Sequence, residues 1–206
     1  MESFKDNLIR KFGKDYLDKV SKARVGLAGA GGLGSNCALN LVRSGLKKLT
    51  IIDFDIIIPS NLDRQFYFLD QVGLNKVEAL KINLLRVNLD LEIKAVVKKI
   101  DKGNIKALFS DCDIVVECFD RAEDKKMLVE ELVGSGKFIV AVSGVGGIGL
   151  SDEIQAHQLK ENLVLVGDLK SDISRNPPIS PRVNIAAAKQ ADLVLTYLLN
   201  NKANLL

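Results

Sequence analysis

The chain has 206 residues, of which 47% are hydrophobic and 27% are charged, and its formal net charge is +3. This length suits one α/β domain, and the composition supplies a sizeable core and excludes a disordered chain. Because the Lys and Arg residues are interleaved with acids, the charge pattern argues against a nucleic-acid binder. No apolar run approaches the ~20 residues of a membrane span, and residues 1–6 lack the apolar core of a signal peptide. We therefore expect a cytoplasmic protein that does not bind membranes.

Alternating strand and helix patterns fill the first two thirds of the chain, after a polar, helical N-terminal arm over residues 1–22. The predicted strands span residues 24–29, 48–53, 92–97, 113–118 and 137–142. The predicted helices between them span residues 32–44, 73–88, 104–109 and 122–133. This alternation predicts a Rossmann-like α/β fold, a mainly parallel sheet with helices on both faces.

The pattern changes after a second glycine-rich turn, residues 143–149. Residues 150–167 predict two short strands with little helix between them, which we expect to be antiparallel additions to the sheet. The segment 169–182 contains three of the four prolines and is the best candidate for a mobile loop. A strongly apolar helix over residues 183–199 is expected to end the fold.

The glycine loop Gly29-Ala-Gly-Gly-Leu-Gly34 stands between the first strand and the first helix. Glycines there permit a tight turn and let backbone N–H groups approach a phosphate at the helix N-terminus. Asp53 ends the second strand, where a carboxylate can accept hydrogen bonds from ribose hydroxyls. Strand, loop, helix and acid together predict a nucleotide site, and the alternative is a packing turn with no ligand.

Two cationic and two amide side chains follow Asp53 in the sequence: Asn61, Arg64, Gln65 and Lys76. A hydride-transfer enzyme needs little positive charge at this place, whereas attack on the α-phosphorus of a triphosphate needs more. Taken singly, each cation is equally consistent with a solvated loop. Asp120 follows a buried strand pattern and suits Mg²⁺ beside phosphates, although it could also cap the helix that begins near residue 122.

Five motifs occur in the order seen in the ThiF/MoeB family, whose members are similar to the adenylation domain of ubiquitin-activating enzymes. The chain resembles this family over residues 20–200, and its short length most resembles the compact ThiF-type enzymes of thiamine biosynthesis. The motifs are Gly29-Ala-Gly-Gly-Leu-Gly34, Asp53-Phe-Asp55, Ser60-Asn-Leu-Asp-Arg-Gln65, Gly73 with Lys76-Val-Glu78, and Glu117-Cys-Phe-Asp120.

The resemblance implies an adenylyltransferase that uses ATP and Mg²⁺. Its substrate would be the C-terminal glycine carboxylate of a ubiquitin-like sulfur-carrier protein with a diglycine tail, similar to ThiS. The implied organisation is an arm over residues 1–22 and an ATP-binding adenylation domain over 23–206 with a C-terminal carrier-binding region. A homodimer is also implied, in which an N-terminal arginine reaches the partner's site. Arg10 is the candidate, although its surroundings match the usual pattern poorly.

The resemblance also assigns roles to individual residues. Asp53 would hold the ribose, and Asp120 would ligate Mg²⁺. Catalysis would rest on Arg64, Lys76 and Asp120. The nucleotide would be bound by Gly29, Gly31, Gly32, Asp53, Asn61, Arg64, Gln65 and Lys76, with the role of Gln65 the least defined.

The chain also departs from the family pattern. Its three cysteines, Cys37, Cys112 and Cys118, form no CxxC pair, so we expect no structural zinc. All three suit small apolar core residues. Because no cysteine follows Cys118, the reaction is expected to stop at the acyl-adenylate. Arg121 stands where many relatives have Asn. The single histidine, His157, is expected to be structural.

Three alternatives remain open at the level of sequence. A nicotinamide-dependent oxidoreductase or NAD sensor would use the glycine loop but leave Arg64, Gln65 and Lys76 unexplained. A ThiF-like enzyme could instead activate a carboxylate on tRNA or on a small molecule, and the absence of a basic face argues against tRNA. An inactive regulatory relative is the third alternative, and the retained charged residues argue against it.

Overall fold

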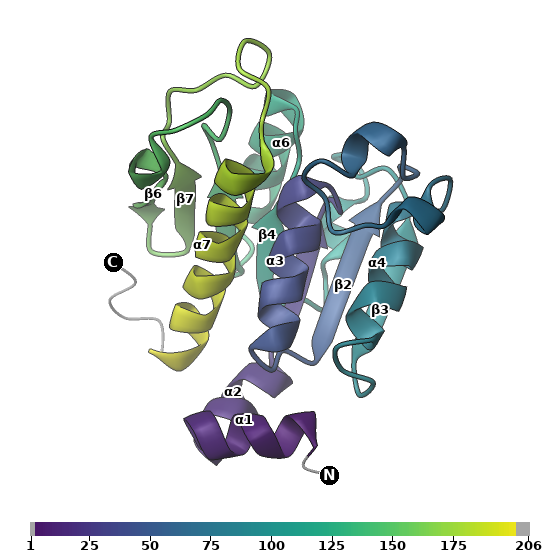
Figure 1. Ribbon diagram of the computed structural model, residues 1–206. Coiled ribbons are helices and arrows are strands. Elements are labelled where there is room, and N and C mark those ends of the chain that lie inside the picture. The colour runs from purple at the N-terminus through teal and green to yellow at the C-terminus, as the bar shows by residue number, and fades with distance from the viewer. Residues whose placement is uncertain (1–2, 201–206) are drawn as a thin grey trace.

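The computed structural model describes residues 3–200 as a seven-stranded sheet with helices on both faces (Figure 1). The strands are β1 (Arg24–Ala28), β2 (Lys48–Asp53), β3 (Glu92–Val97), β4 (Ile114–Glu117), β5 (Phe138–Val142), β6 (Gln155–Lys160) and β7 (Leu163–Gly167). The α-helices are α1 (Phe4–Phe12), α2 (Lys14–Lys22), α3 (Gly32–Arg43), α4 (Lys76–Leu85), α5 (Ile105–Leu108), α6 (Ala122–Leu132) and α7 (Ser180–Leu199). No helix among these residues is long and apolar enough to cross a bilayer.

The strand order is β3-β2-β1-β4-β5-β7-β6, and every neighbouring pair except β6 and β7 is parallel. The predicted Rossmann-like, mainly parallel sheet is therefore confirmed. The two late strands differ from each other, because only β6 runs antiparallel. A short connection joins β6 to β7, which forces these two neighbours to be antiparallel. Since β6 runs against the sheet, β7 returns between β6 and β5 and runs parallel to β5.

Alternating side chains along the buried strands make two apolar cores, one on each face of the sheet. On β4, for example, Ile114 and Val116 point to one core and Val115 to the other. The larger core lies under α3, α4 and α7, and the smaller one under α5 and α6. The strands read as near-continuous apolar runs because helices cover both of their faces.

Residues 4–22 form two helices rather than one, because Gly13 adopts a φ of +86° between α1 and α2. Leu17 and Val20 of α2 are buried, and α2 contacts α7. In Figure 1 both helices lie at the amino end of β1, far from the loops that follow the strands. The last helix begins at Ser180, three residues earlier than predicted, with Pro181 in its first turn, where the missing N–H is tolerated.

The site is positioned by a change of direction in the strand order. The chain passes from β1 to β2 and β3 on one side, and then returns to β4 and β5 on the other side of β1. Loops leaving the carboxyl ends of β1 and β4 therefore diverge and leave a crevice between them, the usual ligand position in such sheets.

Candidate functional site

A pocket of about 880 Å³ opens at the carboxyl edge of the sheet. Its wall combines the glycine loop, the ends of β2 and β4, the start of α6, and loops that follow β5 and β7. The pocket brings together eight of the nine predicted site residues: Gly29, Gly31, Gly32, Asp53, Arg64, Gln65, Lys76 and Asp120. Asn61 does not line it.

The glycine loop leaves β1 and enters α3 in a turn that has little room for side chains. Gly29 adopts a φ of +109°, and a Cβ on Gly34 would lie 2.0 Å from the carbonyl oxygen of Gly29. A Cβ on Gly31, in contrast, would meet only Gln65 Nε2, at 3.8 Å. Gly29 and Gly34 are therefore needed for the turn itself, while Gly31 leaves its backbone open to the pocket.

Asp53 links β2 to the glycine loop. Its Oδ2 accepts a hydrogen bond from the amide of Ala30 at 2.7 Å, and its Oδ1 accepts from the amide of Asp55 at 2.8 Å. Burial raises the pKa of Asp53, although these amides and the charge of Lys76 oppose that shift. The carboxylate is thus held in a fixed orientation at the wall of the pocket, with lone pairs still available to a hydroxyl ligand.

Lys76 lies in the first turn of α4 and is only 6% exposed. Its Nζ lies 2.7 Å from Asp55 Oδ2. The backbone binds the same pair together, because the amide of Lys76 donates to the carbonyl of Asp55 at 3.0 Å. This arrangement keeps a charged ammonium at the pocket wall although its stem is buried.

Arg64 and Gln65 follow a 3-10 turn over Pro59–Asn61. Arg64 Nη1 donates to Asp63 Oδ1 at 2.6 Å and to the carbonyl of Ser60 at 3.1 Å. Gln65 is buried, and its Oε1 has no hydrogen-bond partner among the described residues. The Asn61 side chain accepts from the amide of Ile58 at 3.1 Å, so in this structure it stabilises the turn that carries the other two.

Asp120 is exposed and lines the pocket just after β4. Helix α6 begins at Ala122 with Arg121 at its N-cap position, so Asp120 is not the cap that the sequence allowed. Among residues 3–200 no group of three or more His, Cys, Asp or Glu side chains could hold a metal ion. A magnesium role for Asp120 would therefore depend on phosphate oxygens as further ligands, as Mg²⁺ commonly does.

Two further residues build the site, although neither has a role predicted from the sequence. The hydroxyl of Tyr67 donates to the carbonyl of Ala30 at 2.6 Å and lies 3.2 Å from the carbonyl oxygen of Lys76, so it ties the glycine loop to α4. Glu117 is fully buried and accepts from the amides of Phe119 and Val142 and from Lys125. Glu117 could have been found from the sequence, because it is a carboxylate inside an apolar strand. No pattern in the sequence pointed to Tyr67.

All three cysteines are buried, as expected for core residues. Burial raises the pKa of the Cys37 and Cys118 thiols, so they stay protonated and are poor nucleophiles. His157 lies in β6, and its Nε2 is 3.1 Å from the carbonyl oxygen of Gly167. The three cysteines are therefore core residues, and His157 forms a hydrogen bond between β6 and the end of β7.

Comparisons with known proteins identify the family to which the chain belongs. A model of the ThiF family matches residues 4–204. The Escherichia coli molybdopterin-synthase adenylyltransferase is 32% identical over 149 residues, covering 72% of this chain and 58% of that protein. The adenylyltransferase and sulfurtransferase UBA4 of Candida glabrata is 35% identical over 132 residues, 64% of this chain and 30% of the relative. The chain thus spans less than two thirds of the length of either relative.

A solved structure, the Escherichia coli tRNA N6-threonylcarbamoyladenosine dehydratase TcdA in complex with AMP, has the same fold. It matches with a TM-score of 0.88 at 20% identity, over 96% of this chain and 95% of that chain. Because the family model covers nearly the whole chain and the glycine loop, the acids and the cations of its motifs meet at one pocket, the protein belongs to the ThiF family.

Proposed function

We propose that the protein is an adenylyltransferase that activates the C-terminal glycine carboxylate of a ubiquitin-like sulfur-carrier protein with ATP. One observation carries this proposal: the glycine loop, Asp53, Arg64, Lys76 and Asp120 line a single pocket at the β1–β4 crevice. A nicotinamide enzyme has no evident use for the two cations. Family membership and relatives named as adenylyltransferases support the same class of reaction.

The residues present fit a nucleoside triphosphate. Asp53 would accept hydrogen bonds from the ribose, and the backbone at Gly31 and Gly32 would face the phosphates. Lys76 and Arg64 would neutralise the phosphate oxygens. The unpartnered Gln65 Oε1 is consistent with a donor on the ligand, since a buried acceptor left without a partner is costly. The exposed ion pair between Arg64 and Asp63 is weak enough to be exchanged for a phosphate.

The chemistry needs positive charge more than it needs a base. An oxygen of the carrier carboxylate, already ionised at neutral pH, attacks the α-phosphorus. The bond between the α-phosphorus and the bridging oxygen breaks, and pyrophosphate leaves with the electron pair. The products are an acyl-adenylate and pyrophosphate. Arg64 and Lys76 offset the repulsion between the two anions and stabilise the charge that develops on the leaving group.

Magnesium, held by Asp120 and phosphate oxygens, would supply further charge neutralisation when bound. Asp120 is suited to this because it is exposed at the pocket and not committed to capping α6. Since every cysteine is buried and protonated, the acyl-adenylate would pass to a sulfur donor on another protein.

We propose a ThiS-like carrier of the thiamine pathway, with its diglycine tail entering the pocket and its body resting on the C-terminal region. Exposed apolar side chains occur in the loop after β5, including Ile148 at 81% exposed and Leu150 at 69%. A second group occurs between residues 54 and 82, including Leu69 at 77%. This second group supports a homodimer, in which Arg10 would reach the partner's pocket. The cytoplasmic location stays a prediction.

The test is ATP–pyrophosphate exchange with labelled pyrophosphate, Mg²⁺ and a ThiS-like carrier. We expect exchange that requires the carrier's terminal glycine and falls by at least about 100-fold in Asp120→Ala. Asp111→Ala is the matched control, because Asp111 is an exposed carboxylate before β4 rather than after it. Exchange that proceeds equally with a carrier lacking its terminal glycine would contradict the proposed substrate.

Two alternative activities have their own outcomes in this experiment. ATP binding without exchange on any sulfur carrier would favour a small-molecule carboxylate or a tRNA, and the structural likeness to a tRNA dehydratase makes tRNA worth including. Binding of NAD in place of ATP would contradict adenylation altogether.

A further inference from the structure

A buried ion pair lies beside the pocket and has no role in the chemistry described above. Arg182 lies in the first turn of α7, and Asp168 directly follows β7. Arg182 Nη2 donates to Asp168 Oδ2 at 2.5 Å. The two side chains are only 4% and 6% exposed. A buried pair of this kind costs desolvation and is by itself a weak source of stability.

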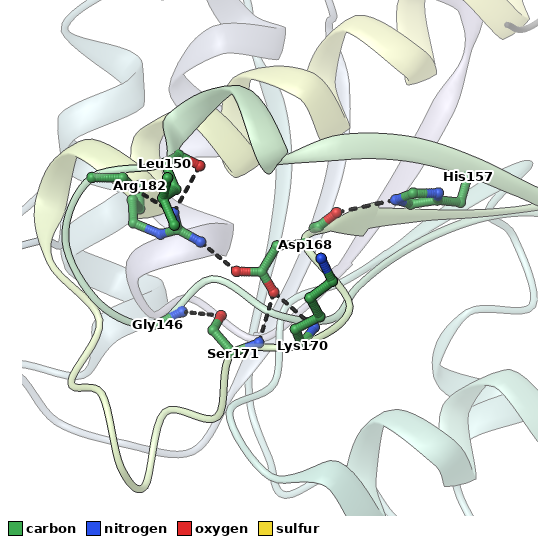
Figure 2. Close-up of polar contacts among 9 residues, drawn as sticks. Gly146, Leu150, His157, Asp168, Lys170, Ser171 and Arg182 are labelled. Carbon is green, nitrogen blue, oxygen red and sulfur yellow. Dashed lines mark hydrogen bonds and ion pairs between the residues drawn. The ribbon is translucent and has the colours of Figure 1, made fainter.

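The pair joins two loops that are far apart in the sequence (Figure 2). Arg182 Nη1 donates to the carbonyl oxygens of Gly149 and Leu150, in the loop that follows β5. The second oxygen of Asp168 accepts from the amides of Lys170 and Ser171, each at 2.8 Å.

A side-chain contact closes the connection between the two loops. Ser171 Oγ accepts from the amide of Gly146 at 3.0 Å. The loop after β5 and the loop after β7 are thus held to each other and to α7. Backbone bonds near the strand ends, from the amide of Asp168 to the carbonyl of Gly144 among them, also join the loops, whereas the farther residues Gly149 and Leu150 are held by the guanidinium.

Strain accumulates at the same place. Leu150 and Leu169 are the two non-glycine residues with positive φ among residues 3–200, at 49° and 61°. Leu150 is a carbonyl partner of Arg182, and Leu169 directly follows Asp168. In addition, Arg182 Nε is buried without a hydrogen-bond partner among the described residues. A network selected for stability alone would avoid both costs, whereas strained backbone is typical of functional sites.

The two loops form the pocket wall on the side away from the nucleotide residues. Ser143–Val145 and Leu169–Ser174 line the pocket, and they follow β5 and β7. The nucleotide residues follow β1 and β2, on the other side of β4 in the strand order. A molecule that attacks the α-phosphorus from opposite the ribose would therefore lie along these loops. Val183, which follows Arg182, packs against Gly32 of the glycine loop, since a Cβ on Gly32 would lie 2.9 Å from a Val183 methyl carbon; this contact is carried by α7 and not by the two loops.

We propose that Asp168 and Arg182 are a positioning pair for the carboxylate substrate: together they hold the two loops as the surface along which the C-terminal segment of that substrate lies. This inference rests on the proposed adenylation reaction. It assigns the pair no contact with the reacting atoms. Its role is to keep the loops in a conformation that they would not adopt alone.

The experiment compares Asp168→Asn, Arg182→Met and the double variant, all well below their melting temperatures. The double variant buries no net charge, so it is expected to regain much of the stability that each single variant loses. The KM for the carrier should nevertheless rise on the order of tenfold or more in all three, because the loops are misplaced. The KM for ATP should stay within about twofold in each variant, because the nucleotide residues lie on other loops.

The double variant and a control distinguish a role in positioning the substrate from a purely structural role. Leu132→Ala thins the core under α6, away from the pocket, and should lower stability without raising the KM for the carrier. The proposal is overturned if the double variant regains the wild-type carrier KM together with its stability. It is also overturned if the KM for ATP rises in step with that for the carrier.

A readout that does not depend on activity separates this inference from the proposed reaction. Amide hydrogen exchange should become faster in residues 143–150 and 168–174 of all three variants, but not in Leu132→Ala. If wild-type protein exchanges no pyrophosphate while these loops still loosen in the variants, the proposed reaction fails and the pair's hold on the loops stands. Unchanged exchange in the loops would contradict that hold.

Discussion

Lys76 is the residue at which burial and charge conflict most directly in the pocket. Its side chain is nearly buried, yet it keeps an ammonium within 2.7 Å of Asp55, whose own side chain is 48% exposed. Because Asp55 is half in water, the pair is cheap to rearrange, and the ammonium can turn toward a phosphate. The lysine is thus oriented in advance by its buried stem and its helix position.

Replacement of Lys76 by Met tests this role, because Met keeps the apolar stem and removes the charge. We expect pyrophosphate exchange to fall about 100-fold while the melting temperature changes little. Lys81→Met is the matched control, since Lys81 lies in the same helix but does not line the pocket. Equal losses of activity in the two variants would argue against a phosphate contact by Lys76.

At the scale of elements, two glycines in the turn between β1 and α3 have different roles, one in packing and one in ligand binding. Gly34 is required by packing, because a Cβ there would collide with the backbone of Gly29. The φ of Gly31 is −76°, which other residues also adopt, and a Cβ there would meet only Gln65 Nε2 at 3.8 Å, so the fold has room for a methyl group. Glycine is therefore needed at this position only if a ligand approaches the backbone of Gly31.

The two glycines therefore predict opposite results. Gly34→Ala should destabilise the protein by about 3 kcal/mol, because the helix must move away from the loop. Gly31→Ala should fold normally and bind ATP about tenfold more weakly, because the methyl group occupies the approach of the phosphates. Urea unfolding and ATP titration of both variants measure these effects. Normal ATP affinity in a well-folded Gly31→Ala protein would place the phosphates elsewhere.

For the whole molecule, the ion pair of Asp168 and Arg182 connects stability to pH. Burial alone would raise the pKa of Asp168, but the amides of Ser171 and Lys170 and the charge of Arg182 outweigh it and hold the pKa below its ordinary value of 3.8. A carboxyl with a lowered pKa contributes stability above its unfolded pKa. That contribution is lost as the pH falls through the lower pKa of the folded state.

The free energy of unfolding should therefore differ between wild type and Asp168→Asn in a pH-dependent way. At neutral pH we expect the variant to be less stable by about 3 kcal/mol, because Arg182 is left buried without a counter-charge. The difference should shrink as the pH falls below 3.8, because the carboxyl is protonated in the unfolded chain before it is protonated in the folded wild type. Urea unfolding between pH 3 and 7 measures it. A constant difference down to pH 3 would contradict the assigned ion pair.

The sequence by itself determined the sheet and most of the pocket. Strand and helix periods along the chain are local properties, so β1 to β5 and the helices between them were predicted close to their observed bounds. Asp53 and Asp120 were found because each follows a predicted strand, and the glycine loop because it joins a strand to a helix. Arg64 and Lys76 were found as cations that follow Asp53 and match the family motifs. The carboxyl ends of parallel strands meet at one edge, so the pattern also predicted that these residues would converge.

Only the tertiary structure decided which late strand is antiparallel, how Asn61 is used, and which residues hold the site in place. Tyr67 contacts Ala30 across 37 positions in the sequence, and Arg182 reaches back to Gly149 across 33. A side chain that meets a distant backbone carbonyl leaves no period or spacing in the sequence. Such contacts exist only once the sheet has brought the loops after β5 and β7 beside α7, because folding, not sequence proximity, makes them neighbours.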